Sequence, residues 1–193
     1  MSRIALIAAV ALTLVPAAGA SVRLYDHGLA VVDDPYGPPR LVDLEGGRVH
    51  ALYGSGRSFS IGSGFATRLP ERGRVRLDAR GGTIGGRRVR LLGLRSAQVR
   101  FRSGGATLAG TLMMPPGRGP RAAIAYVTGS GPTTREYLPE LQALLLHDGV
   151  AVLAYDKRGV GASGGTYPGE SPTELAIDQK PQQEGQQNRN DRQ

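Results

Sequence analysis

The fold is decided by the run Ala122-Ala123-Ile124-Ala125-Tyr126-Val127, a continuous apolar stretch typical of a strand that is buried on both faces. After a glycine-containing loop, leucines recur at helical spacing, and His147-Asp148-Gly149 favours the end of a helix. These leucines are Leu138, Leu141, Leu144 and Leu145. A second apolar run, residues 150–155, follows directly. Strand, helix and strand with short connections predict a βαβ unit with two parallel strands.

Two alternating runs precede this unit and predict an antiparallel hairpin in the same sheet. Residues 99–102 and 107–113 flank the turn sequence Ser103-Gly104-Gly105. The fold class that we expect for residues 96–178 is therefore α/β, with an incomplete sheet made of this opening hairpin plus one βαβ unit.

Residues 21–95 consist of short alternating or apolar runs separated by turn residues, which predicts a small β-rich domain before the α/β part. The 193-residue chain has a formal net charge of +8, and most of the excess lies in this half. Its arginines alternate with apolar residues in Arg74-Val75-Arg76-Leu77 and Arg88-Val89-Arg90-Leu91, as on a strand with one solvated face. No aromatic residues are interleaved to stack bases, so we expect no nucleic-acid partner.

Both ends of the chain carry recognisable signals. Met1-Ser2-Arg3, the apolar run 4–15 and Ala18-Gly19-Ala20 have the layout of a secretory signal peptide cleaved after Ala20, with a retained N-terminal anchor as the alternative. The apolar run is shorter than the roughly 20 residues of a membrane-spanning helix, so we expect a periplasmic or secreted protein with no stable membrane span. Ser171-Pro172-Thr173-Glu174 predicts a further helix start, and residues 179–193 predict a disordered polar tail. The expected divisions are 1–20, 21–95, 96–178 and 179–193.

Three motifs carry a resemblance to a known family. They are Phe101-Arg102-Ser103-Gly104-Gly105-Ala106-Thr107-Leu108-Ala109-Gly110-Thr111-Leu112, Gly129-Ser130-Gly131-Pro132 and Tyr155-Asp156-Lys157-Arg158-Gly159-Val160-Gly161-Ala162-Ser163. In this order and spacing they resemble the first third of an α/β-hydrolase domain of the secreted esterase and serine-aminopeptidase-like group. The resemblance covers about 80 residues and implies an incomplete α/β-hydrolase sheet, a small-molecule ester or acyl substrate, and no metal or organic cofactor. The β-rich domain is similar to an extension that some secreted members carry.

The resemblance implies that the loop at Gly129-Ser130-Gly131 supplies half of an oxyanion hole. The backbone N–H of Ser130 is then the best candidate donor, and that of Gly131 is the next. Glycines suit this role because they let the backbone approach a developing oxyanion closely. An ordinary strand-to-helix turn is the alternative interpretation. The sequence departs from the family at Thr128, where a histidine is usual.

A G-x-S-x-G pattern occurs at Gly161-Ala162-Ser163-Gly164-Gly165, but its context differs from that of a nucleophile elbow. An elbow serine lies directly between a strand and a helix, whereas residues 156–160 and 166–170 separate Ser163 from both. We therefore interpret this segment as a structural loop that contains Asp156, Arg158, Gly159, Gly161 and Ser163. Asp156 and Arg158 are expected to pair with each other or to brace the loop.

A serine hydrolase also needs a nucleophilic serine, a histidine and an orienting acid, which in this family follow the helix predicted at Ser171. No candidates for them follow in this sequence, and His147 is expected to be a surface residue at a helix end. We therefore expect an exported serine hydrolase that acts on carboxylic esters or similar acyl substrates, here as a truncated and inactive fragment. The alternative is a non-catalytic exported protein that binds a partner, such as an anionic surface, through its basic β-rich domain. The absence of cysteine excludes disulfides, thiolate zinc sites and a cysteine nucleophile.

Overall fold

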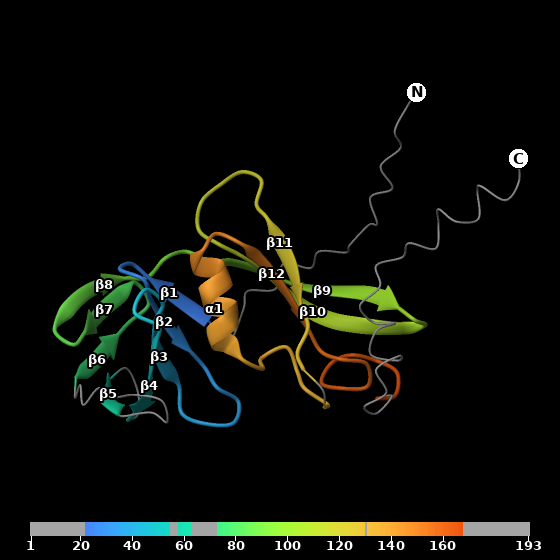
Figure 1. Ribbon diagram of the computed structural model, residues 1–193, viewed down its shortest axis with the longest axis horizontal. Helices are drawn as coiled ribbons and strands as arrows, with labels where there is room; N and C mark the ends of the chain where they lie inside the picture. The colour runs from blue at the N-terminus through green and yellow to red at the C-terminus, as the bar shows by residue number, and fades with distance from the viewer. Residues whose placement is uncertain (1–21, 55–57, 63–72, 130, 168–193) are drawn as a thin grey trace, which may run out of the picture.

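The computed structural model describes residues 22–54, 58–62, 73–129 and 131–167 (Figure 1). The predicted signal peptide, Ser130, the helix start at Ser171 and the polar tail lie outside these residues. The described part of the chain contains twelve strands and one helix, α1 (Pro139–His147). The expected α/β fold class, with its incomplete α/β-hydrolase sheet, is therefore wrong, and the fold is β-rich. The physical reason is that a single βαβ unit contributes only one helix, while short strands joined by tight turns make up the rest.

The N-terminal half forms a meander in which each strand pairs antiparallel with the next. Its ends also meet: Tyr25 and Leu91 form an antiparallel bridge, and the N–H of Leu92 donates to the carbonyl oxygen of Leu24 at 2.8 Å. Because its first and last strands contact each other, we call this meander the barrel. Its strands are β1 (Val22–Tyr25), β2 (Leu29–Val32), β3 (Arg40–Asp43), β4 (Arg48–Tyr53), β5 (Ser58–Gly62), β6 (Arg74–Leu77), β7 (Gly81–Ile84) and β8 (Arg87–Arg90).

The alternation predicted for the arginine-containing strands is confirmed. On β6, Val75 and Leu77 are buried while Arg74 and Arg76 are exposed, and on β8 only Val89 is buried. The inward side chains pack into one hydrophobic cluster, so apolar burial holds the short strands together. The cluster contains Tyr25, Val31, Leu41, Leu52, Val75, Leu77, Ile84 and Val89.

The second sheet has the order β11-β12-β10-β9. Strands β9 (Arg95–Ser103) and β10 (Ala106–Met114) form the antiparallel hairpin, with Ser103 opposite Ala106. Strands β11 (Ala123–Tyr126) and β12 (Ala151–Tyr155) pair in parallel, and α1 connects them. Strand β12 is mostly buried, as expected, but the prediction for β11 is wrong. It lies at the edge of the sheet, and Tyr126 is its one buried residue.

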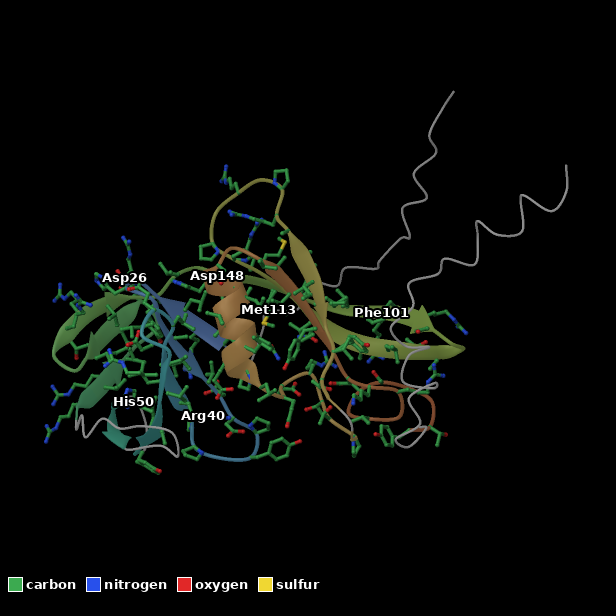
Figure 2. All side chains as sticks on the ribbon, viewed as in Figure 1. Asp26, Arg40, His50, Phe101, Met113 and Asp148 are labelled. Carbon is green, nitrogen blue, oxygen red and sulfur yellow. The ribbon has the colours of Figure 1, made fainter. Side chains whose placement is uncertain are left out.

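Helix α1 lies between the barrel and the second sheet (Figure 1). Ala143 and Leu146 of the helix are fully buried in a cluster with residues of β1, β2 and β3 on one side and of β10 and β12 on the other. Met113 of β10, labelled in Figure 2, belongs to this cluster. An ion pair of 2.7 Å between Arg40 of β3 and Glu140 of α1 adds a polar contact. One hydrophobic core is therefore shared by both halves of the described chain.

The buried face of α1 differs from the leucine stripe seen in the sequence. Leu138, Leu141 and Leu144 are 46%, 42% and 38% exposed, whereas Gln142, Ala143 and Leu146 are buried. Ala143 is small and allows the helix to approach the barrel closely. The amide Nε2 of Gln142 donates to the carbonyl oxygens of Arg135 and Tyr137, which satisfies two carbonyls before the helix begins. Leu145, the fourth leucine of the predicted stripe, is half-buried against the shared core. The helix thus has one apolar face covered by the barrel and the second sheet, and a second one that carries the exposed Leu141 and Leu144.

Candidate functional site

The candidate site lies where the parallel strands β11 and β12 end. Because these strands are neighbours and run in the same direction, the loops that follow them begin at the same edge of the sheet. The loop after β11 contains the glycine-rich motif, and the loop after β12 contains Asp156, Lys157 and Arg158. The two motifs singled out in the sequence are therefore brought together.

Lys157 joins the two loops. Its side-chain Nζ donates hydrogen bonds to the carbonyl oxygens of Gly129 and Gly131, the latter at 2.9 Å. The residue is only 4% exposed, and this burial lowers the pKa of its ammonium group. No carboxylate among the described residues lies within 4 Å of it. The carbonyl oxygens are thus its compensating partners, and the glycine-rich loop is held at two points.

Hydrogen bonds within the loop after β11 link Thr128, Gly131 and Thr133. The hydroxyl of Thr128 is buried and shares a short hydrogen bond with the hydroxyl of Thr133. The N–H of Thr133 also donates to the carbonyl oxygen of Gly131 at 2.9 Å. Gly131 has φ +95°, a backbone conformation that favours glycine. Of the two predicted oxyanion-hole donors, Gly131 is described, whereas Ser130 lies outside the described residues.

Asp156 is paired with Arg135 rather than with Arg158. Arg135 Nε donates to Asp156 Oδ1 at 3.0 Å, and Nη2 donates to Oδ2 at 2.6 Å. The backbone N–H groups of Arg135 and Ala162 donate to the same carboxylate at 3.0 and 2.8 Å. Burial alone would raise the pKa of Asp156, but the hydrogen bonds from Arg135 and Ala162 and the charge of Arg135 outweigh it and lower the pKa. Arg158 instead donates to the carbonyl oxygens of Gly104 and Ser103 in the β9–β10 turn.

Arg135 extends this contact to the hairpin. Its Nη1 donates to Gln98 Oε1 of β9 at 2.8 Å and to Thr111 Oγ1 of β10 at 3.3 Å. The side chain is 11% exposed, so its interactions are largely shielded from water. A single guanidinium therefore fixes the loops after β11 and β12 against the hairpin.

Ser163 is held inside the loop after β12. Its hydroxyl donates to the carbonyl oxygen of Asp156 at 2.7 Å and accepts from the N–H of Ala109 at 2.9 Å. Two glycines of this loop lie so close to neighbouring atoms that a side chain would not fit. A Cβ on Gly159 would lie 2.2 Å from the backbone nitrogen of Tyr167, and a Cβ on Gly161 would lie 2.6 Å from Asp156 Oδ2. At these two positions the backbone of the loop packs directly against Tyr167 and Asp156.

The three histidines lie away from these loops. His147 is exposed at the end of α1, and because α1 runs antiparallel to the strands it connects, it lies at the opposite edge of the sheet. His27 is exposed in the β1–β2 turn, and His50 is buried on β4 in the barrel. None of the three is hydrogen-bonded to a serine within the part of the chain that the structure describes.

Sequence reasoning missed Arg135 and gave no role to Lys157. Lys157 stands inside the third motif, so its position offered a signal. Arg135 had none, because only the pairing of β11 with β12 brings it to Asp156. Within residues 22–54, 58–62, 73–129 and 131–167, no three His, Asp or Glu side chains gather as metal ligands do. No helix in those ranges has the length and apolar character to cross a membrane.

The hydrolase resemblance rests on the three sequence motifs. The motifs lie in the β9–β10 hairpin and in the loops after β11 and β12, and Lys157, Arg135, Ser163 and Arg158 connect these segments. No protein-family model matches the chain, and no curated protein matches it at a significant level.

Proposed function

We propose that the loops after β11 and β12 form the oxyanion-stabilising part of an exported serine hydrolase that acts on carboxylic esters or similar acyl substrates. In this proposal the nucleophilic serine, the histidine and its orienting acid are supplied from outside the 193 residues, because all three histidines of the sequence lie away from these loops. The observation that carries the proposal is the pair of hydrogen bonds from Lys157 to the carbonyl oxygens of Gly129 and Gly131.

The chemistry explains why these hydrogen bonds matter. When a serine hydroxyl attacks an acyl carbonyl, its proton passes to histidine and the carbonyl oxygen becomes an oxyanion. Backbone N–H groups must then point at that oxygen, and no carbonyl oxygen should face it. Lys157 binds the carbonyl oxygen of Gly129, and in a trans peptide the N–H that follows a carbonyl points the opposite way, so in this proposal the N–H of Ser130 faces away from Lys157. The carbonyl of Gly131 precedes Pro132, which has no N–H, so the hydrogen bond to Gly131 fixes the loop without orienting a donor. Ser130 and Gly131 remain the proposed donors.

Lys157 acts in this proposal as a positioning residue. Loss of one oxyanion-hole donor lowers kcat by about 10²–10³-fold in well-studied hydrolases. Because Lys157 orients donors without contacting the substrate, we expect Lys157→Met to lower kcat at least about tenfold with little change in KM. The matched control is Arg102→Met, which removes an exposed cation from β9.

The test compares the 193-residue chain with longer products. The DNA that follows the codon for Asp178 is translated in all three frames, and each product is assayed with a fluorophosphonate probe and with 4-nitrophenyl acetate. We expect the 193-residue chain to remain unlabelled, and one longer product to be labelled and to hydrolyse the ester. Lys157→Met is then measured in that product. Failure of every frame to give a labelled product refutes the proposal, and labelling of the 193-residue chain at Ser163 refutes the assignment of the nucleophile.

A further inference from the structure

A second candidate site lies on the barrel, apart from the loops after β11 and β12. The surface over β6, β7 and β8 has a broad depression, open to solvent, with a volume of about 800 Å³. This volume is in the range of small-molecule binding pockets. Its lining includes four arginines, two aspartates and one threonine: Arg76, Arg80, Arg88, Arg90, Asp26, Asp78 and Thr83. We call this feature the arginine hollow.

Two glycines of β7 line the hollow, together with Leu77 of β6 and Val89 of β8. Gly81 and Gly82 of β7 both have φ +147°, and a Cβ on either would lie within 2.2 Å of a backbone oxygen of a neighbouring strand. Neither position can therefore carry a side chain without a shift of the strands. The register places Thr83 opposite Arg76 of β6 and also opposite Arg88 of β8. The hydroxyl-bearing Thr83 thus lies between two strand positions with exposed arginines, next to Gly82.

The positive charge of the hollow is only partly compensated. No carboxylate among the described residues lies within 4 Å of the guanidinium groups of Arg76, Arg80 or Arg88. The two aspartates of the hollow accept hydrogen bonds from backbone N–H groups. Asp78 Oδ1 accepts from the N–H groups of Arg80 and Gly81, at 2.7 and 3.1 Å.

Asp26 is engaged in the same way. Its Oδ1 accepts from the N–H of Arg90 at 2.9 Å, and its Oδ2 is 3.9 Å from Arg90 Nε. Its place beside β8 can be followed in Figure 2. Four guanidinium groups against two carboxylates leave the hollow with an excess of two positive charges.

We propose that the arginine hollow binds a small organic phosphate ester. A phosphate monoester carries close to two negative charges, which matches the excess charge of the hollow. Its oxygens accept paired hydrogen bonds from the planar fork of arginine. The phosphate would lie over Gly82 and Thr83 between Arg76 and Arg88, and the rest of the hollow would hold the organic part. This proposal does not depend on the proposed hydrolase function, because it uses neither of the loops after β11 and β12.

Calorimetric titration of the whole 193-residue chain tests the proposal. Inorganic phosphate and glucose 6-phosphate are the probes, and citrate is the competing anion. We expect both phosphates to bind with one-to-one stoichiometry, the sugar phosphate more tightly, and the affinity to fall as salt screens the arginines. Dissociation constants weaker than about 10 mM for both phosphates would overturn the proposal. Binding of citrate without binding of phosphate would overturn the ligand class.

Matched variants locate the site. Arg88→Gln and Arg76→Gln each remove an exposed guanidinium of the hollow and should weaken binding at least about tenfold, since hydrogen bonds between charged groups are the strong ones. Arg87→Gln and Arg74→Gln remove the same charge from exposed positions on the same strands, outside the lining of the hollow. These controls should change affinity less than about threefold, through screened long-range attraction alone. Equal weakening in all four variants would show diffuse attraction to a basic surface and would overturn the proposed site.

Discussion

Replacement of Arg135 by methionine tests the interaction that holds the candidate site together. Asp156 is 3% exposed and its partner is 11% exposed, so the pair is shielded from water. Removal of one partner of a buried ion pair costs about 3–5 kcal/mol, because the remaining charge stays buried. In Arg135→Met the two backbone N–H donors of residues 135 and 162 remain, so we take the lower end of this range. The free energy of unfolding should fall by about 3 kcal/mol.

Urea denaturation followed by circular dichroism measures this loss. The matched control is Arg48→Met, which breaks the ion pair of 2.9 Å between Arg48 and Asp43 on the barrel. Those side chains are 43% and 21% exposed, so the control should cost less than about 1 kcal/mol. Asp156→Asn combined with Arg135→Met should cost less than the sum of the two single changes, because the double variant leaves no buried charge unpaired. Similar small losses in Arg135→Met and Arg48→Met would refute the reasoning.

The same pair gives a pH dependence whose sign can be worked out. Because the folded-state pKa of Asp156 is lowered from its ordinary value of 3.8, the stabilisation is complete above that value and is lost as pH falls below it. The difference in unfolding free energy between the unchanged chain and Asp156→Asn should therefore shrink below pH 3.8. In Arg135→Met, the Asp156 carboxylate keeps its burial but accepts fewer hydrogen bonds, so its pKa should be lowered less. The loss of unfolding free energy below pH 3.8 should therefore be smaller in this variant. If the free energy of unfolding fell equally with decreasing pH in the unchanged chain and in Arg135→Met, the role given to Arg135 would be contradicted.

Two further predictions concern Lys157 and α1. Because burial lowers the folded-state pKa of Lys157 below 10.5, the unfolded chain binds its proton more tightly, and the free energy of unfolding should rise with pH as pH increases from the folded-state pKa toward 10.5. Lys157→Met should lack this rise in urea titrations at increasing pH, and an unchanged profile would contradict the burial of the ammonium group. Leu146→Ala should cost about 2–5 kcal/mol because Leu146 is fully buried between the barrel and the second sheet. Leu144→Ala on the same helix should cost less than about 1.5 kcal/mol, since Leu144 is 38% exposed, and equal losses in urea denaturation would count against the packing of α1.

Local patterns predicted the elements of the second sheet because their signals lie within a few residues. The turn at Ser103-Gly104-Gly105 sets the hairpin, and the apolar run at 150–155 becomes the buried strand β12. The fold class could not be predicted in the same way. It depends on how many short strands pair and on whether the meander closes. That closure rests on the contact between Tyr25 and Leu91, which no local pattern encodes.

The candidate site shows the same division between local and distant information. The motifs were visible because glycines in tight loops are a local signal. The partner of Asp156 was not, because Arg158 is close in sequence and Arg135 is close in space. The choice of the buried face of α1 also depends on a distant surface. The leucine stripe predicted a core face, but Leu141 and Leu144 are exposed, and Ala143 and Leu146 pack into the core between the barrel and the second sheet.

The exposed apolar surface at the β11 edge of the second sheet bears on the proposed hydrolase. Leu141 and Leu144 are exposed on the helix, and Ile124, which is 44% exposed, lies on the edge strand β11. An exposed apolar edge strand favours pairing with a further strand. A strand that paired in parallel with β11 would end beside the loop that Lys157 holds. A nucleophile placed just after such a strand would therefore lie next to the proposed oxyanion donors, which is the arrangement that acyl transfer requires.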